Sequence, residues 1–414
     1  MTVNFRISNG TETRETGAYT VTVPGKKPIS EGNEKPVVIP ELAEWDGGNG
    51  EFTVTDISRI VINPAYDAAL SFMEAEFKAD YQDITGREIE IVSGTEPGTH
   101  DFYFTLGSSD RGLKEEGYIM AVGEGVSVEA VDPVGAYWST RTILQILSQT
   151  GDSIVKGTAR DYPKYQIRGL MLDVGRKAIS REFLETLIKE MAWYKMSDFQ
   201  IHLNDNAFSD QYDSVEQAKQ AYSGFRLESD IKEGGVNAAD LTSEDMYYTK
   251  DEFRDLIQTS RQMGIDIVPE FDTPAHSLAF TKVRPDLIFA ETLKGVDHLN
   301  LHEKYDESLT FVQSVWNEYM EGENPVFDSE TIVNVGTDGY DGTYTEELRQ
   351  YTDDMLKFVQ DKGNAVRLWG SLTQRSGTTP VRSEGVQMNL WNTSWANPQE
   401  MYNAGFELIN MVDH

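Results

Sequence analysis

After Pro163, the sequence alternates short apolar runs with longer segments of helical periodicity. Alternating strands and helices form crossover units whose strands lie parallel in one sheet, and a (β/α)8 TIM-type barrel is the closure that such repeats favour. The chain ends just after the last run, one run short of a complete barrel. We therefore expect an α/β barrel truncated before its eighth strand, and a natural protein that continues past His414 with a further strand and helix. The runs occupy residues 169–174, 198–203, 265–271, 331–336, 365–370, 385–391 and 406–412.

Helix start and stop signals separate these runs. Thr249 and Glu252 have the spacing of a capping box, in which each side chain bonds to the backbone N–H of the other residue, and Gly264 ends that helix. Residues 181–196 carry a helical apolar face, which we expect to be buried. The members of this face are Phe183, Leu184, Leu187, Ile188 and Met191.

The residues before the barrel show a different pattern. Strand-like runs, a Gly-Glu-Gly turn and one helical stripe occur within residues 37–163, which predicts a small α+β domain ahead of the barrel at 164–414. Residues 25–36 are rich in proline, glycine and charge, which is typical of a linker. Residues 1–24 are too few for a domain and end in the alternating run 19–23, so we expect the tail of an upstream β domain. The strand-like runs are 101–106, 118–122 and 126–131, and the helical stripe is 135–147.

The charge balance and the composition exclude several functions. The chain contains 36 Lys and Arg residues and 69 Asp and Glu residues, and its formal net charge is −33. This negative charge repels nucleic-acid phosphates and anionic membranes, so neither is an expected partner. No apolar run has the roughly 20 residues of a membrane helix, and the opening residues contain no signal-peptide pattern. The absence of cysteine excludes disulfides, thiol nucleophiles and Cys-ligated metals.

Polar and aromatic side chains follow the apolar runs. In a (β/α)8 barrel, the catalytic and substrate-binding residues lie at the carboxyl ends of the strands. Tryptophan rings cover the apolar face of a pyranose while acids and arginine bind its hydroxyls, so this pattern predicts a sugar pocket. Two alternatives stay open, because an acid after a strand also caps helices and a single tryptophan also fills cores. The candidates are Asp173, Arg176, His202, Asp205, Asp272, His276, Asp338, Trp369, Trp391 and Trp395.

One histidine pair has the spacing of a metal site on a helix. His298 and His302 are separated by Leu-Asn-Leu, and the alternating leucines indicate a strand instead of a helix. The sequence therefore predicts no metal site.

Several strand-end motifs resemble, in order, those of glycoside hydrolase family 20, which contains the β-N-acetylhexosaminidases and the lacto-N-biosidases. The resemblance covers roughly residues 37–414, including the small α+β domain. It implies a retaining exo-glycosidase without metal or organic cofactor, which acts on β-linked GlcNAc or GalNAc or releases a Gal-GlcNAc disaccharide. It also implies an extracellular or cell-surface bacterial protein whose partners are glycans. The motifs are RGLMLDVGR (168–176), HLNDN (202–206), EFDTPAH (270–276), NVGTDGY (334–340), RLWGSL (367–372) and QMNLWNTSW (387–395).

The resemblance implies a substrate-assisted mechanism, an exception to the usual pair of catalytic carboxylates. The 2-acetamido oxygen of the sugar attacks the anomeric carbon, an Asp orients the acetamido group, and the adjacent Glu is the general acid and base. Asp338 matches the Asp, whereas Gly339 stands where the Glu belongs, and Asp341 is too short to replace it. Loss of a general acid slows a reaction by about 10²–10⁴-fold. We therefore expect a disabled, almost inactive family member; a non-catalytic glycan-binding pseudo-enzyme is the alternative.

The resemblance implies roles for other strand-end residues as well. Arg176 matches an arginine that binds hydroxyls of the terminal sugar, and Asp205 and His276 match a pair that supports the missing Glu. The expected walls of the acetamido pocket are Trp369, Trp391 and Trp395, with Asp413 as a contact of the acetamido oxygen or of a sugar hydroxyl.

Overall fold

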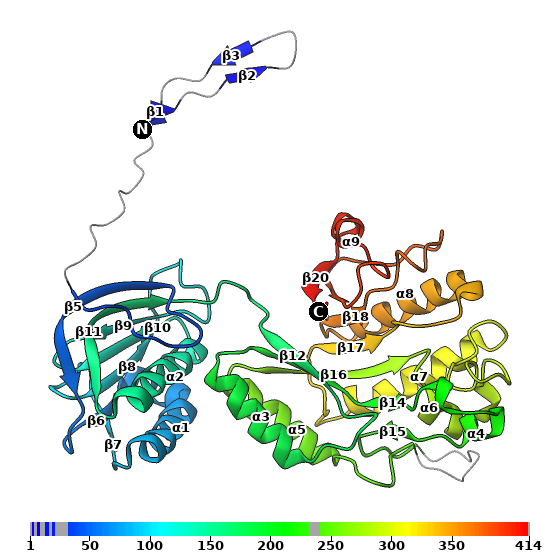
Figure 1. Cartoon of the computed structure of the whole chain (residues 1–414), viewed down its shortest axis with the longest axis horizontal. Coiled ribbons are helices and arrows are strands. Elements are labelled where there is room, and N and C mark those ends of the chain that lie inside the picture. Colours follow the sequence, from blue (N-terminus) through cyan, green and yellow to red (C-terminus); the bar gives the residue numbers. More distant parts are fainter. Residues whose placement is uncertain are drawn as a thin grey trace. The chain divides into compact units, whose positions relative to one another are not determined.

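The computed structural model describes residues 32–231 and 241–412, and before them only the backbone of four short strands (Figure 1). The chain divides into two compact units, Met1–Tyr162 and Pro163–His414. The expected strand at 19–23 is described only in β4, and residues 21–31, with most of the expected linker, lie outside the described residues. The short strands pair antiparallel, β1 with β4 and β2 with β3. Their bounds are β1 (Thr2–Val3), β2 (Arg6–Ser8), β3 (Thr13–Glu15) and β4 (Tyr19–Thr20).

The first unit is built on a seven-stranded mixed sheet in the order β5-β11-β9-β10-β8-β6-β7. β6, β7, β8 and β10 run parallel, β9 is antiparallel to β10 and β11, and β5 is antiparallel to β11. The predicted Gly-Glu-Gly turn joins β9 to β10 as a hairpin. The bounds are β5 (Glu44–Thr53), β6 (Arg59–Ile62), η1 (Pro64–Tyr66), α1 (Asp67–Thr85), β7 (Glu90–Ser93), β8 (Phe102–Leu106), β9 (Tyr118–Val122), β10 (Val126–Ala130), α2 (Pro133–Thr150) and β11 (Ser153–Asp161).

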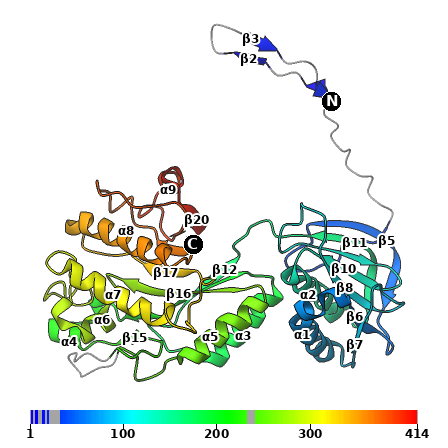
Figure 2. The ribbon, with the colours of Figure 1, turned by 180° about the vertical axis from the view of Figure 1, so that it is seen from behind.

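Helices α1 and α2 pack against each other and against this sheet (Figures 1 and 2). Aromatic side chains fill the space between them, as Phe77 of α1 shows. Its ring centroid lies 5.6 Å from those of Phe102 and Phe104 on β8, in edge-to-face contacts, and all three side chains are fully buried. Such pairs stabilise a core beyond the area they bury, so this α+β unit has a hydrophobic core of its own, and the α+β prediction is confirmed.

The second unit contains a seven-stranded parallel sheet in the order β12-β13-β16-β17-β18-β19-β20. Neighbours in the sheet are successive strands of the βα repeats, so the barrel-type fold predicted from the alternating pattern is confirmed. Within the described residues, β12 and β20 form the two edges of the sheet. The strands are β12 (Gly169–Asp173), β13 (Asp198–His202), β16 (Asp266–Thr273), β17 (Val333–Gly336), β18 (Val366–Trp369), β19 (Val386–Leu390) and β20 (Glu407–Asn410).

The helices of this unit begin and end where the sequence signals lie. Thr249 and Glu252 form both bonds of the capping box at the start of α5, and Gly264 follows the helix with a left-handed φ of 74°. The expected apolar face of α3 is only partly buried, because the side chain of Phe183 is 53% exposed. Phe183 lies in the first turn of α3, next to the exposed Glu182. The helices are α3 (Arg181–Trp193), α4 (Val215–Lys219), α5 (Lys250–Gln262), α6 (Leu278–Val283), α7 (Tyr305–Met320), α8 (Thr345–Asp361) and α9 (Pro398–Ala404), with η2 (Ser209–Gln211), η3 (Pro285–Leu287) and η4 (Gly342–Tyr344).

Two connections depart from a simple βα repeat. After β13 the chain forms an antiparallel pair, β14 (Asn204–Asn206) and β15 (Ser223–Phe225), at the carboxyl end of the sheet. Between β18 and β19, a segment that the structure describes throughout, no helix is formed and the connection is made of turns. None of the helices in the described ranges combines the length and the apolar character needed to cross a membrane.

Candidate active site

Parallel pairing brings the carboxyl ends of the strands to one edge of the sheet. Asp173 at the end of β12 pairs in register with His202 at the end of β13, and His202 pairs with Glu270 of β16. Glu270 in turn is in register with Asn334 of β17. Strand ends far apart in the sequence therefore lie side by side, as expected for the site of a barrel.

Asp205 is the centre of a buried network at this edge. Its Oδ2 lies 2.8 Å from His202 Nε2 and 2.7 Å from Arg176 Nη2. Its Oδ1 accepts from His276 Nδ1 at 3.0 Å and from the backbone N–H of Asn206 at 2.7 Å. Burial raises the pKa of Asp205, but the bonds from His202 and His276 outweigh burial and hold the pKa well below its usual range. The structure thus brings together three of the predicted site residues around one carboxylate.

Glu270 is a second buried centre, and it is not among the candidates named from the sequence, although it lies in one of the motifs. Its Oε1 accepts from Trp369 Nε1 at 2.6 Å and contacts His202 Nδ1 at 2.7 Å, and its Oε2 accepts from Gln200 Nε2 at 2.6 Å. Burial lowers the pKa of His202, but the charges of Glu270 and Asp205 raise it well above its ordinary value. An acid inside the buried stretch of β16 was the signal that could have found Glu270.

The turn after β17 places Asp338 beside His276. Gly336 has a φ of 74°, and a Cβ there would lie 2.1 Å from Asp272 Oδ1, so this turn requires glycine. Thr337 also has a φ of 74°, and its N–H donates to Asp272 Oδ1 at 3.1 Å. Asp338 Oδ1 then lies 3.1 Å from His276 Nε2, but at an angle that leaves Oδ1 without an aligned hydrogen-bond donor among the described residues.

The charges around His276 determine the protonation of its imidazole and of the carboxyl groups beside it. Burial lowers the pKa of His276, but the carboxylates of Asp338, Asp272 and Asp205 raise it well above its ordinary value. Burial and the charge of Asp338 raise the pKa of Asp272. Burial also raises the pKa of Asp338, but His276 outweighs it and lowers the pKa. An imidazolium beside an ionised Asp338 therefore fits this arrangement.

Gly339 leaves space at the position where the resemblance places a glutamate. A Cβ added to Gly339 would lie 3.7 Å from Ala275 Cβ and 3.7 Å from His276 Nε2, both ordinary contacts. Asp341 does not turn toward this space, because its side chain caps η4 by accepting from Thr343 N at 2.8 Å. The local backbone can thus hold a longer side chain at 339, and Asp341 has a structural role instead.

The predicted tryptophans have different environments. Trp391 and Trp395 lie close together, with ring centroids 5.0 Å apart and an interplanar angle of 47°. Trp369 is buried and held by Glu270, so its position is fixed from within the barrel. Asp413 lies outside the described residues.

Some buried polar atoms near the strand ends have no hydrogen-bond partner within the described residues. Buried polar groups are normally satisfied, so such atoms call for an explanation, and a ligand is one. We call the residues that carry them the unpaired side of the site: Thr337 (Oγ1), Asp338 (Oδ1), Asn389 (Oδ1) and Trp391 (Nε1). We call the residues of the hydrogen-bonded network the paired side: Arg176, His202, Asp205, Glu270 and His276.

The carboxylates and histidines of the strand-end cluster pair with one another. Three groups of carboxylates and histidines have potential ligand atoms within 4.8 Å of one another, and all belong to the strand-end cluster. Both ring nitrogens of His202 and of His276 already contact carboxylates. His298 and His302 contact Asp297 and Glu347 separately. The strand predicted from their alternating leucines is wrong, since only Leu299 forms a single bridge, with Ile288, where the chain turns.

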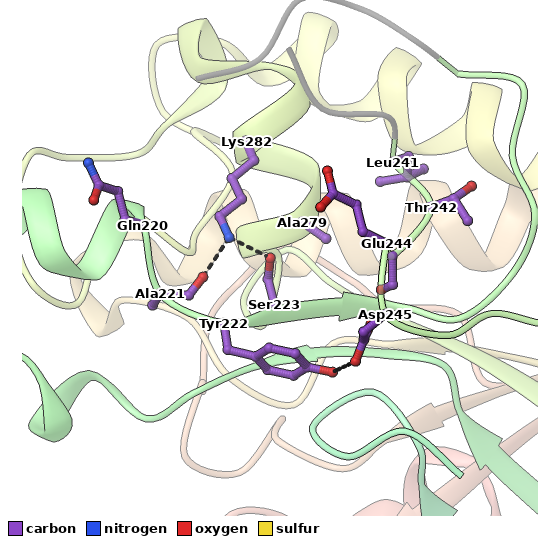
Figure 3. A pocket seen from close by; sticks show the side chains of 11 residues that line it. Gln220, Ala221, Tyr222, Ser223, Leu241, Thr242, Glu244, Asp245, Ala279 and Lys282 are labelled. Carbon is purple, nitrogen blue, oxygen red and sulfur yellow. Dashed lines mark hydrogen bonds between the residues drawn. The ribbon is translucent and has the colours of Figure 1, made fainter. Parts of the chain in front are cut away.

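A cavity of about 310 Å³ lies outside this cluster, lined by residues of α6, of β15 and of the segment after residue 240 (Figure 3). Lys282 Nζ donates to Ala221 O at 2.5 Å and to Ser223 Oγ at 2.9 Å, and burial lowers the pKa of its amine. Tyr222 donates to Asp245 Oδ2 at 3.0 Å. None of the residues predicted from the sequence lines this cavity.

Comparisons with known proteins agree with this fold. Residues 165–346 match the catalytic domain of glycosyl hydrolase family 20, and residues 35–162 match domain 2 of the same family. A lacto-N-biosidase of Bifidobacterium bifidum is 23% identical over 399 residues, covering 91% of this chain and 33% of that protein. A beta-hexosaminidase of Vibrio furnissii is 27% identical over 279 residues, covering 61% of this chain and 40% of that protein. The chain thus spans less than half the length of these relatives.

Solved structures show the same fold. The family 20 beta-N-acetylhexosaminidase from Streptomyces coelicolor A3(2) superposes with a TM-score of 0.72 at 20% identity, over 92% of this chain and 76% of that one. A mutant beta-hexosaminidase of Streptomyces plicatus in complex with its product GlcNAc gives a TM-score of 0.70 at 19% identity, over 92% of this chain and 75% of that one. The two family matches, in chain order over most of the sequence, show that the chain belongs to glycosyl hydrolase family 20.

Proposed function

We propose that this chain binds glycans that end in β-linked N-acetylhexosamine, or in Gal-GlcNAc, and that its site is built for substrate-assisted, retaining hydrolysis. The observation that carries the proposal is the carboxylate of Asp338. His276 lowers the pKa of this carboxyl, Asp338 follows the end of β17, and its Oδ1 lacks an aligned donor within the described residues. A substrate acetamido N–H is a donor of the kind that this oxygen needs.

The proposed reaction uses the two sides of the site differently. The acetamido oxygen attacks C1 of the sugar, the bond from C1 to the leaving oxygen breaks, and a cyclic oxazolinium-like intermediate forms. Asp338 accepts the acetamido N–H and stabilises the positive charge that develops on the nitrogen. Arg176, fixed by Asp173 and Asp205, binds sugar hydroxyls. Trp391 and Trp395 supply aromatic surface for the sugar ring.

The glycine at position 339 determines the turnover rate that we expect for glycoside substrates. The site lacks the carboxyl group that would protonate the leaving oxygen, so turnover of ordinary glycosides is slower by about 10²–10⁴-fold than with a glutamate. A Cβ at position 339 meets only ordinary contacts beside His276. The alternative, a glycan-binding protein without turnover, rests on the same glycine.

The substrate and the location of the protein are parts of the proposal. The lacto-N-biosidase and the beta-hexosaminidase among the relatives support a disaccharide and a monosaccharide as the released unit, respectively. An extracellular or cell-surface location in a bacterium follows the family resemblance. Such a location fits a protein that acts on large glycans.

Gly339→Glu tests the function. We expect a gain of about 10²–10⁴-fold in kcat/KM on aryl β-N-acetylglucosaminide, aryl β-N-acetylgalactosaminide or aryl lacto-N-bioside, and the substrate that responds identifies the released unit. Gly339→Gln is the matched control, because it has the same size and no acid. Sugar binding without any gain would favour the non-catalytic alternative, and absence of both binding and turnover would overturn both readings.

A further inference from the structure

His276 lies beside position 339, where the general-acid glutamate is missing. Its Nε2 would lie 3.7 Å from the Cβ of any side chain at position 339. Apart from its chain neighbours Asp338 and Tyr340, no other titratable group among the described residues lies within 4 Å of that point. The Nε2 atom therefore faces the space from which a glutamate would extend toward the leaving oxygen.

The other ring nitrogen of His276, Nδ1, already forms a hydrogen bond within the protein. Nδ1 donates to Asp205 Oδ1 at 3.0 Å, and Asp205 is held ionised by its own partners. Arg176 Nη2 lies 3.4 Å from the same Nδ1 and, as a donor itself, supplies no acceptor. The proton available for transfer is therefore the one on Nε2.

The surroundings keep this proton on the ring. The carboxylates of Asp205, Asp272 and Asp338 face His276 from three different strand ends, and Arg176 is the one cation in contact with it among the described residues. The excess of negative charge favours the imidazolium. Asp338 Oδ1 contacts Nε2 at 3.1 Å as an ion pair but without hydrogen-bond alignment, so this contact holds the ring and leaves the Nε2 proton able to bond to a second acceptor.

We propose that His276 acts as the substitute general acid of this chain, with its Nε2 proton carried to the leaving oxygen by one water molecule in the space beside Gly339. The inference rests on the proposed function. The C1–O bond breaks as the acetamido oxygen bonds to C1, Nε2 gives its proton to the water, and the water gives a proton to the leaving oxygen. In the second half, water attacks C1, the bond from C1 to the acetamido oxygen breaks, and the excess proton returns to Nε2 by the same path.

The test compares two leaving groups on the unmodified chain. The phenol of a phenyl glycoside needs a proton to leave. The 2,4-dinitrophenolate of a dinitrophenyl glycoside departs as a stable anion. Both are prepared as N-acetyl-β-glucosaminides and as lacto-N-biosides. We expect His276→Gln, whose amide can still bond to Asp205, to lower kcat/KM on the phenyl substrate by about 10²-fold and on the dinitrophenyl substrate by less than threefold. His302→Gln, on an exposed histidine, is the matched control and should change neither.

Two further measurements do not depend on the folding of that variant. In the unmodified chain, phenyl-glycoside hydrolysis should fall as pH rises through the raised pKa of His276, while dinitrophenyl hydrolysis stays constant over that range. Gly339→Gln should displace the water and lower phenyl-glycoside hydrolysis to the level of His276→Gln. Equal losses of kcat/KM on both leaving groups, or the same pH profile for both, would overturn the proposed role of His276. Either result would leave the proposed function standing. No hydrolysis of either dinitrophenyl substrate would overturn this inference and the proposed catalysis together, and would leave the non-catalytic, glycan-binding alternative.

Discussion

The paired and the unpaired sides of the site differ in how their polar atoms are satisfied. On the paired side, every carboxylate oxygen of Asp205 and Glu270 contacts a donor group of the protein. On the unpaired side, Asp338 Oδ1 and Trp391 Nε1 have no hydrogen-bond partner within the described residues. A satisfied network holds a fixed geometry, whereas an unsatisfied atom is free to bind a ligand. The paired side thus provides rigidity, and the unpaired side provides affinity for the ligand.

The largest effect is expected from breaking the paired side. Asp205→Ala leaves His202, His276 and Arg176 without their shared carboxylate, and removal of one partner of a buried ion pair costs about 3–5 kcal/mol. Urea denaturation should show a loss of this size in the free energy of unfolding. Asp210→Ala, at an exposed position of η2, is the control and should change stability by less than about 0.5 kcal/mol. A loss of less than about 1 kcal/mol at Asp205 would contradict the central position of this group.

The unpaired side should respond in ligand affinity instead. Asp338→Ala should weaken the binding of a thiazoline mimic of the cyclised intermediate by about 1.5–3 kcal/mol, the range for a charge-assisted hydrogen bond. The free energy of unfolding should fall by less than in Asp205→Ala, because Oδ1 loses the ion-pair contact with His276 Nε2 at 3.1 Å but no aligned hydrogen bond within the described residues. Titration calorimetry measures the affinity, with Asp341→Ala as the control that leaves it unchanged. Equal affinity in Asp338→Ala and the parent would mean that Asp338 is only structural.

The same substitution, Trp→Phe, can be made once on each side of the site. Trp369→Phe removes the indole N–H that donates to the buried Glu270, which should cost about 1–3 kcal/mol of stability. Trp391→Phe removes an N–H with no partner among the described residues, so stability should stay within about 0.5 kcal/mol, while thiazoline binding weakens. Thermal unfolding and calorimetry on both variants check the pair. A larger loss of stability in Trp391→Phe would reverse the comparison.

The smallest predicted effect is the pH dependence of the paired side. His202 has a pKa raised above 6.5 in the folded state, so its stabilising contribution is present below pH 6.5 and is lost as pH rises through the raised value. Asp205 has a lowered pKa, so its contribution is present above about pH 4 and is lost as pH falls through the lowered value. A tenfold difference in proton affinity between the folded and unfolded chains corresponds to about 1.4 kcal/mol of stability.

Melting temperatures from pH 5 to pH 9 measure this effect. The parent should lose stability toward the alkaline end of the range, and His202→Gln should lose less over the same interval. His302→Gln should follow the parent. A parent whose melting temperature rises steadily to pH 9 would contradict the raised pKa of His202.

The sequence alone predicted the βα repeats and the strand ends that carry polar side chains. Periodicity shows which segments are strands and helices, and Thr249 with Glu252 marks a helix start, because these signals act within a few residues of the chain. The order of the motifs also predicted that Asp205, His276 and Asp338 belong to one site, because the carboxyl ends of parallel strands meet at one edge. The absence of an acid at Gly339 is likewise a property of the sequence.

Only the tertiary structure decided which of these groups touch. The contacts of Glu270 with His202 and Trp369 depend on strand register and burial, which a local pattern does not encode. Phe183 follows the helical apolar pattern and is nevertheless exposed, since a pattern shows a face but not what covers it. The left-handed backbone of His276, with a φ of 55°, and the turn at Gly336 together set the distance from Nε2 to position 339. That distance results from packing between two strand ends some 60 residues apart in the chain, which is why the sequence showed a missing acid and only the fold showed the histidine beside it.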